Sequence, residues 1–481
     1  MNENFDDFNE SEINDLVDKF EEKLKKRQAF FFDVEEYETL IDYYVENDDV
    51  KKAELILKNA IEQHPDSFSL LLKKAQVFVY SDQPEKALKL LNKLEKIEPE
   101  NSDVFFAKGA IYSQLQHSEK AIEEYKKAIS GSEALDEVYL NIALEYEQLK
   151  NYTKSIEYYT KALDLNPDNE LALYELSYCY EQADQVKESL RFFTEFLDNH
   201  PYNRTAWSVL GSAYNSDNQI DKAIESFDFA IAIDERDPSA YYQKATVYYA
   251  NKMYNKAIEI YQEILDLKLE YFLATPYFFL GECYEKMEDY ETALINYNLS
   301  LKIDDKNPDA WVGRGICHFE LRKINEALLD VKKGISLSET DNVSDYKLIL
   351  AEMLYKENLE GDLELYKEII EQHPDNTDAW LDYSDALRDR DKLDEAIDIL
   401  ELAVKSYPEK LEFPYRLAAL LLLSGNTGYA FHVLSDVMNM DKTKKNMQEF
   451  FGYINELELD EHFLDIIEEF RRNIDDNQIQ E

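Results

Sequence analysis

The chain has 481 residues, and 52 Lys and Arg against 101 Asp and Glu give it a formal net charge of −49. A chain this acidic lacks the basic surface needed to bind a phosphate backbone or an anionic membrane, so we predict neither a nucleic-acid nor a membrane partner. Its hydrophobic content of 45%, with 35 Tyr and 25 Phe, excludes a disordered acidic tail and predicts a large folded core.

Residues 1–33 are expected to form an acidic tail followed by a capping helix. The first residues are acidic and lack the apolar stretch of a signal peptide. Residues 12–32 have helical spacing, with one apolar face made by Ile13, Leu16, Val17, Phe20 and Leu24. Three Cys in the chain and no apolar run of about 18 residues favour a cytoplasmic protein without disulfides.

Residues 34–444 repeat with a period close to 34 residues. Three pairs of prolines show this spacing, namely Pro65 and Pro99, Pro167 and Pro201, and Pro374 and Pro408. Alignment on one anchor residue per period gives about twelve copies, anchored at Tyr37, Leu71, Phe105, Tyr139, Leu173, Trp207, Tyr241, Tyr277, Trp311, Tyr346, Trp380 and Pro414. A repeat of this length predicts stacked copies of one small structural unit.

Each copy has the pattern of two antiparallel helices. In the copy anchored at Trp207, residues 207–214 and 223–230 both carry apolar side chains at helical spacing. A small residue stands four places after most anchors, as Gly211 does, and a second small residue, such as Ala223, recurs in the second helix. These small residues predict close approach of the two helices. Asn, Asp or Ser follows most of the prolines within two residues and can cap the next helix.

This order of residues resembles the tetratricopeptide repeat. The copy that carries it best has the pattern residues Trp207, Leu210, Gly211, Tyr214, Ala223, Phe227 and Ala230. The resemblance implies an all-α, right-handed superhelical solenoid of stacked antiparallel helix hairpins. The tenth copy departs from the pattern with Leu350 and Asp362 at small-residue places, so its hairpin is expected to be splayed or its boundary shifted.

After the array, residues 445–474 are expected to form C-terminal capping helices or a degenerate repeat. Their apolar positions are Phe450, Phe451, Ile454, Phe463, Ile466, Ile467 and Phe470. Such a cap would cover the apolar face that a terminal repeat exposes. Residues 475–481 are expected to form a tail.

No catalytic residue, metal site or cofactor is predicted. Cys179, Cys283 and Cys317 each stand two residues after the small residue of a first helix, which indicates a packed side chain. There is no CxxC motif and no phosphate-binding glycine loop. The carboxylates are so numerous that no pair stands out for acid–base catalysis.

A partner-binding surface is predicted on the first helices, which line the concave face in the family. The places two before the anchor, and one, five, eight and nine after it, hold the candidate contacts Phe106, Glu147, Tyr174, Tyr178, Glu181, Tyr242, Tyr249, Phe278, Glu282 and Glu285. Aromatic rings in a negative field suit a basic or amphipathic peptide. The same tyrosines also suit packing between neighbouring helices, so both interpretations stay open. No copy has the Lys and Asn pair through which some family members bind a C-terminal carboxylate.

The leading hypothesis is a non-enzymatic scaffold or adaptor that binds a protein or peptide in an acidic, aromatic-lined concave face. The alternative is a structural subunit that self-associates or joins a multiprotein assembly through its extended surface. An enzyme is disfavoured because the repeats leave too few residues for a catalytic domain. The sequence leaves the oligomeric state open.

Overall fold

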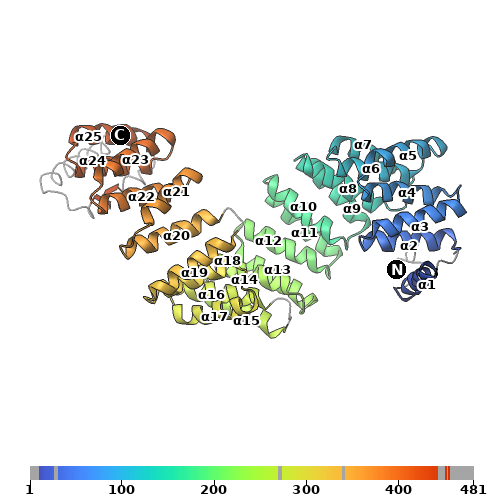
Figure 1. The fold of residues 1–481 in the computed structure, drawn as a ribbon, viewed down its shortest axis with the longest axis horizontal. Helices are drawn as coiled ribbons and strands as arrows, with labels where there is room; N and C mark the ends of the chain where they lie inside the picture. The colour runs from blue at the N-terminus through green and yellow to red at the C-terminus, as the bar shows by residue number, and fades with distance from the viewer. Residues whose placement is uncertain are drawn as a thin grey trace. The chain divides into compact units, whose positions relative to one another are not determined.

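The computed structural model describes residues 10–26, 31–268, 273–338, 342–441, 450, 451, 453 and 454. Within these residues the chain forms 25 helices and no strand (Figure 1). The predicted all-α solenoid of helix hairpins is therefore confirmed. None of the described helices combines the length and apolar character needed to cross a membrane.

One helix, α1 (Glu10–Lys25), precedes twelve consecutive helix pairs. The first helices of the pairs are α2 (Val34–Glu46), α4 (Phe68–Tyr80), α6 (Ser102–Gln114), α8 (Leu135–Gln148), α10 (Glu170–Gln182), α12 (Arg204–Ser216), α14 (Pro238–Ala250), α16 (Ala274–Lys286), α18 (Pro308–Glu320), α20 (Val343–Lys356), α22 (Thr377–Asp389) and α24 (Glu412–Leu423). The second helices are α3 (Val50–Gln63), α5 (Pro84–Ile97), α7 (Ser118–Ala128), α9 (Tyr152–Leu165), α11 (Val186–Asn199), α13 (Ile220–Ile233), α15 (Tyr254–Asp266), α17 (Tyr290–Ile303), α19 (Ile324–Leu337), α21 (Asp362–Gln372), α23 (Leu393–Ser406) and α25 (Thr427–Met440).

Several of the first helices begin where a side chain caps them. Asn169, Asn203 and Asn376 stand two residues after a proline, and each accepts a hydrogen bond from the backbone N–H three residues on, at 2.8–3.0 Å.

The turn between the two helices of a hairpin is regular, because a residue with positive φ stands eleven places after the anchor in all copies but the tenth. In the tenth copy Asn358 takes this conformation twelve places after Tyr346, so its turn is shifted by one residue.

The two helices of a hairpin approach closely at the small residues. A Cβ added at Gly211 would lie 2.6 Å from Cε1 of Phe227, and Gly109 and Gly281 face Tyr125 and Tyr297 in the same way. These aromatic rings are almost fully buried, so they cannot move aside without disturbing the core. The repeat therefore needs glycine at these places because of the large ring on the facing helix.

Gly211→Ala is expected to lower the free energy of unfolding by about 1–3 kcal/mol, because the added methyl group overpacks the contact with Phe227. Gly428→Ala is the matched control, because Gly428 is also helical and nothing lies within 4 Å of its added Cβ. The control should be neutral or slightly stabilising, since Ala favours helix over Gly. Urea unfolding of both variants checks this, and an equal loss in both would contradict the packing argument.

The chain divides into two compact units, Met1–Val247 and Tyr248–Glu481, with the division inside α14. In the first unit, α1 covers the first hairpin with the buried side chains of Leu16 and Phe20. This helix ends at Lys25, earlier than the expected 12–32, and Asp33 already caps α2 through a reciprocal pair of hydrogen bonds with Glu36.

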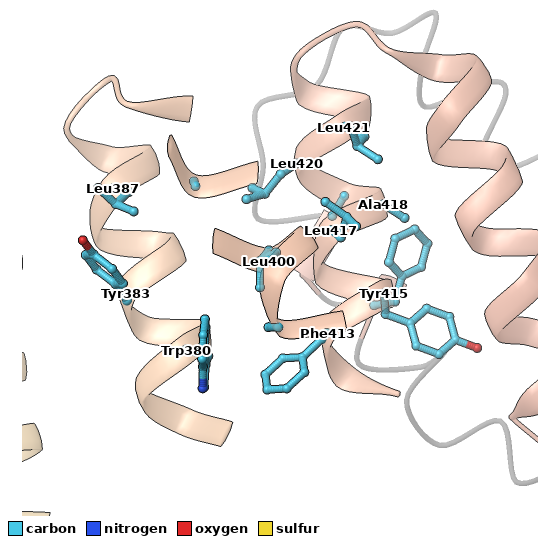
Figure 2. Packing of buried hydrophobic residues seen from close by; sticks show 14 of the residues in the cluster. Trp380, Tyr383, Leu387, Leu400, Phe413, Tyr415, Leu417, Ala418, Leu420 and Leu421 are labelled. Carbon is cyan, nitrogen blue, oxygen red and sulfur yellow. The ribbon is translucent and has the colours of Figure 1, made fainter. Parts of the chain in front are cut away.

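In the second unit, the last hairpins share a large apolar cluster (Figure 2). It contains Trp380 and Leu387 from α22, Leu400 from α23, and Phe413 and Leu420 from α24. Phe450 and Ile454 are buried against it beyond the last hairpin. The rest of the expected C-terminal cap, residues 445–449, 452 and 455–474, lies outside the described residues, as do residues 1–9 and the tail 475–481.

Candidate functional site

A groove of about 630 Å³ runs along the first helices α2, α4 and α6 in the first unit. Every residue that lines it comes from these three helices. Among them are Asp42, Val45 and Glu46 on α2, Leu72, Gln76 and Tyr80 on α4, and Asp103, Phe106 and Ala110 on α6. These nine residues occupy the places that the resemblance assigns to the concave face, and Phe106 is the candidate contact among them.

The groove combines an apolar floor with a mainly acidic rim. Small residues, including Ala75 and Ala107, make room on the floor. On the rim, the Lys73 ammonium donates to both carboxylate oxygens of Asp42 at 2.7 Å, while Glu46 and Asp103 are exposed. Such a surface can accept an apolar side chain that is flanked by positive charge.

The predicted tyrosines differ in how accessible they are. Tyr174 and Tyr178 are exposed on α10, and the Tyr178 ring meets Tyr152 edge-on with centroids 6.5 Å apart. Tyr242 and Tyr249 on α14 are half-buried and fall in different compact units. Burial raises the pKa of Tyr249, and its ring packs edge-on against Tyr254. Tyr174 and Tyr178 are thus the members of this set that are most available to a partner.

The remaining aromatic candidate and two of the carboxylates are engaged within their own hairpins. Phe278 packs against Phe279 and Tyr297. Glu147 accepts a hydrogen bond from Tyr159 at 2.6 Å, and Glu285 accepts one from Tyr297 at 2.7 Å. Each pair joins the places eight and twenty after the anchor, so a Glu and a Tyr at these places form a recurring link between the two helices.

The other two carboxylates have different surroundings. Glu181 is exposed on α10. Burial, together with the nearby carboxylates of Glu285 and Asp309, raises the pKa of Glu282 to about 7 against the opposing effect of Lys286. In α22, burial likewise raises the pKa of Asp382 to about 6. Both carboxyl groups therefore hold their protons more tightly in the folded chain than an exposed carboxyl group does.

Glu282→Gln is expected to stabilise the chain at pH 8 but much less at pH 5. The folded Glu282 keeps its proton up to pH about 7, while the unfolded chain releases it near the ordinary value of 4.5. The folded state binds more protons in this window, so the stability from this group falls as pH rises through it. Thermal unfolding at both pH values checks this, with the exposed Glu291→Gln on α17 as control. The same difference at both pH values would contradict it.

The three cysteines are buried free thiols. Burial raises the pKa of Cys179 and of Cys283 to about 12, which keeps both protonated and unreactive at neutral pH. In the part of the chain that the structure describes, no group of three or more His, Cys, Asp or Glu side chains could hold a metal ion.

Several polar contacts between side chains were missed by sequence reasoning. Lys73 and Asp42 lie on neighbouring first helices, two and five places after their anchors, and could be found by scanning opposite charges one repeat apart. In the ninth copy, Asp330 is buried and accepts hydrogen bonds from Arg314 at 2.7 and 2.8 Å, and it lies 2.9 Å from the His318 ring. This cluster has no counterpart in the repeat pattern.

Comparison with known protein families agrees with the observed array of helix hairpins. Models described as "Tetratricopeptide repeat" match residues 44–111, 102–130, 137–169, 171–201, 237–306 and 360–412, and one described as "TPR repeat" matches residues 211–252. Together they cover more than half of the chain, which belongs to the tetratricopeptide repeat family. Membership of this family supports a role as a protein–protein interaction scaffold or adaptor.

Among solved structures, two have some similarity to this chain. The APC/C hetero-tetramer Cut9–Hcn1 has 14% identity and a TM-score of 0.41 over 80% of this chain and 90% of that one. YrrB, described as a TPR protein with an unusual peptide-binding site, has 22% identity and a TM-score of 0.31 over 39% of this chain and 95% of that one. No curated protein sequence matches the chain.

Proposed function

We propose that this protein is a non-enzymatic scaffold or adaptor that binds a basic or amphipathic peptide of a partner protein on its first helices. The observation that carries the proposal is the groove along α2, α4 and α6, which is lined by first helices alone and has an apolar floor below an acidic rim. Its volume of about 630 Å³ is large enough for several side chains of a bound segment.

The negative charge of the chain favours a basic partner segment. The net charge of −49 attracts a basic segment at long range, and the exposed Glu46 and Asp103 continue that field at the groove. The apolar floor then favours slow dissociation once an apolar side chain is seated. Tyr174, Tyr178 and Glu181, which are exposed on α10, are proposed as further contacts. The same role is proposed for the half-buried candidates Glu147, Tyr242, Tyr249, Phe278, Glu282 and Glu285.

The test uses a fluorescent amphipathic helical peptide composed only of Leu and Lys, whose anisotropy is measured with the full chain at low and high salt. Ala110→Arg places a large cation at an exposed position of the groove and should weaken binding about tenfold or more. Ala232→Arg on α13 is the matched control, because it adds the same side chain at an exposed alanine outside the groove. Binding to the control should equal binding to the unmodified chain.

Further variants test the two parts of the proposed surface, the groove and the α10 contacts, one at a time. Glu46→Lys with Asp103→Lys should slow association and flatten its salt dependence, since both carboxylates lie on the rim. Tyr178→Ala tests the α10 contacts without removing a buried side chain. Affinity capture from a native lysate with the unmodified chain and Ala110→Arg then identifies the natural partner. If neither the groove variants nor Tyr178→Ala changes peptide binding, the proposed surface is wrong.

A self-associating structural subunit is the second candidate, and an apolar stripe on α17 favours it. Ile295, Leu299 and Ile303 are exposed at successive helical turns. Most other copies carry a charged residue at the places of Ile295 and Leu299, and α17 alone is apolar at both. If this stripe joins two copies, the mass measured by light scattering should rise with concentration, and Ile295→Asp should abolish the rise. A mass independent of concentration would exclude this candidate.

A further inference from the structure

A second pocket, of about 460 Å³, lies on the side of the second helices in the first unit. Leu197 and Asp198 of α11 form one wall, Glu225 and Phe229 of α13 form the other, and Trp207, Leu210 and Tyr214 of α12 also line it. We call it the Trp207 pocket. It shares no lining residue with the groove on α2, α4 and α6, so it is a separate candidate site.

The aromatic wall of the Trp207 pocket is fixed in place. The Trp207 ring stacks on the Phe229 ring with centroids 4.5 Å apart and an interplanar angle of 27°. Trp207 Nε1 donates a hydrogen bond to the Pro201 carbonyl at 2.9 Å, which sets the ring orientation. Phe229 is exposed and Trp207 is half-buried, so a bound group can reach this pair. The site is therefore preorganised for a flat or apolar group.

The ninth copy shows what fits at the equivalent place. There Arg314 stands three residues after the anchor Trp311, as Leu210 stands three residues after Trp207. The Arg314 guanidinium lies 4.4 Å from the centroid of the Trp311 ring. It donates to the Asp330 carboxylate at 2.7 and 2.8 Å and to the Asn298 side chain at 2.8 Å. This part of the repeat can thus hold a guanidinium against its anchor tryptophan.

The sixth copy lacks all three of these polar side chains. Leu210 replaces Arg314, Ser226 replaces Asp330, and Thr194 of the preceding copy replaces Asn298. All three replacements line the Trp207 pocket. Because Ser and Thr are shorter than the residues that they replace, the side chains at these places fill less space in the sixth copy than in the ninth.

The charges around the Trp207 pocket favour a cation. Asp198 and Glu225 line it and are exposed, and neither forms an ion pair within the described residues. Lys222 is the one lining cation, and its ammonium lies 5.2 Å from the Tyr214 ring centroid. Two carboxylates against one ammonium leave the pocket negative, and a guanidinium can both stack on an aromatic ring and pair with a carboxylate.

We propose that the Trp207 pocket binds an arginine side chain of a partner protein. The guanidinium would stack on the Trp207 and Phe229 pair and bond to Asp198 and Glu225, as Arg314 does with Trp311 and Asp330 in the ninth copy. The proposal goes beyond peptide binding in the groove, because it uses different helices and one specific side chain.

The test follows the three tryptophans of the full chain, Trp207, Trp311 and Trp380, by fluorine NMR after labelling with 5-fluorotryptophan. The probe is the capped peptide acetyl-Gly-Arg-Gly-amide, compared with its Lys and Leu analogues. The arginine peptide should shift the Trp207 resonance and leave Trp311 and Trp380 unchanged. The Lys analogue should bind about fivefold more weakly or worse, because an ammonium cannot stack as a planar guanidinium does.

Two sets of variants complete the test. Asp198→Asn with Glu225→Gln should weaken the arginine peptide about tenfold, while Glu195→Gln, an exposed carboxylate of α11 outside the pocket, should have no effect. Leu210→Arg with Ser226→Asp introduces the counterparts of Arg314 and Asp330 and should abolish binding by filling the pocket from within. Equal binding of the Arg and Lys peptides, tighter binding of the Leu peptide, or indifference to the Asp198 and Glu225 changes would overturn the proposal.

Discussion

Leu400→Ala should lower the free energy of unfolding by about 2–5 kcal/mol. Leu400 is fully buried on α23, within the cluster that holds Trp380 and Leu387 of α22 and Leu417 and Leu420 of α24 (Figure 2). Truncation leaves a cavity that the packed helices on both sides cannot close. Urea unfolding followed by tryptophan fluorescence measures the effect, because Trp380 belongs to the same cluster.

Leu402→Ala is the matched control for this prediction. Leu402 lies on the same helix two residues further on, and its side chain is 50% exposed, whereas Leu400 is 0% exposed. The same truncation there should change stability by about 0.5 kcal/mol or less. In a stacked array the loss at Leu400 should also reach the adjacent hairpins, which share its interface. Equal effects of the two truncations would show that α23 is packed differently.

Asp330→Ala should cost about 3 kcal/mol, because it leaves the guanidinium of Arg314 without its carboxylate in a largely buried place. The Asp330 and Arg314 side chains are 8% and 17% exposed, so water can replace little of the lost interaction. Glu357→Ala is the matched control. It removes a carboxylate that pairs at 3.0 Å with Arg322, which is 80% exposed, and should cost about 1 kcal/mol or less.

A double variant distinguishes the cost of leaving a buried charge unpaired from the cost of lost packing. Arg314→Leu with Asp330→Ser copies the residues that the sixth copy has at the same places, Leu210 and Ser226. It removes both charges together, so it should be less destabilised than Asp330→Ala. Thermal unfolding of the single and double variants gives the coupling between the two side chains. A double variant less stable than the single variant would contradict a penalty from the uncompensated cation.

Some features of this protein could be predicted from local sequence. The anchors, the small residues such as Gly211, and the capping Asn residues after the prolines act within one hairpin or one turn, so their spacing is visible in the chain. The same logic failed at the end of the N-terminal helix. The predicted helix over residues 12–32 is too long at this end, because α1 ends at Lys25, before the cap that Asp33 places on α2.

The candidate site was less predictable, because its side chains compete for contacts inside the fold. Tyr174 and Tyr249 occupy predicted contact places, yet Tyr174 is exposed and Tyr249 half-buried, since their neighbours differ. Glu147 and Glu285 are predicted contacts as well, and each accepts a hydrogen bond from a tyrosine of its own hairpin. Repeat position places a residue on a face, and only the neighbouring side chains decide whether it is accessible.

The amino-acid sequence by itself determines the helix hairpin, its period and its small close-packing residues, because these depend on side chains that are near in the chain and repeated twelve times in register. The tertiary structure alone decides where space is left between copies. The groove on α2, α4 and α6 and the Trp207 pocket both depend on side chains from three helices, and the pocket is open because Leu210, Ser226 and Thr194 stand where Arg314, Asp330 and Asn298 fill the ninth copy. Such space depends on how much volume the neighbouring side chains fill together, and the position of a single residue in the repeat does not reveal that.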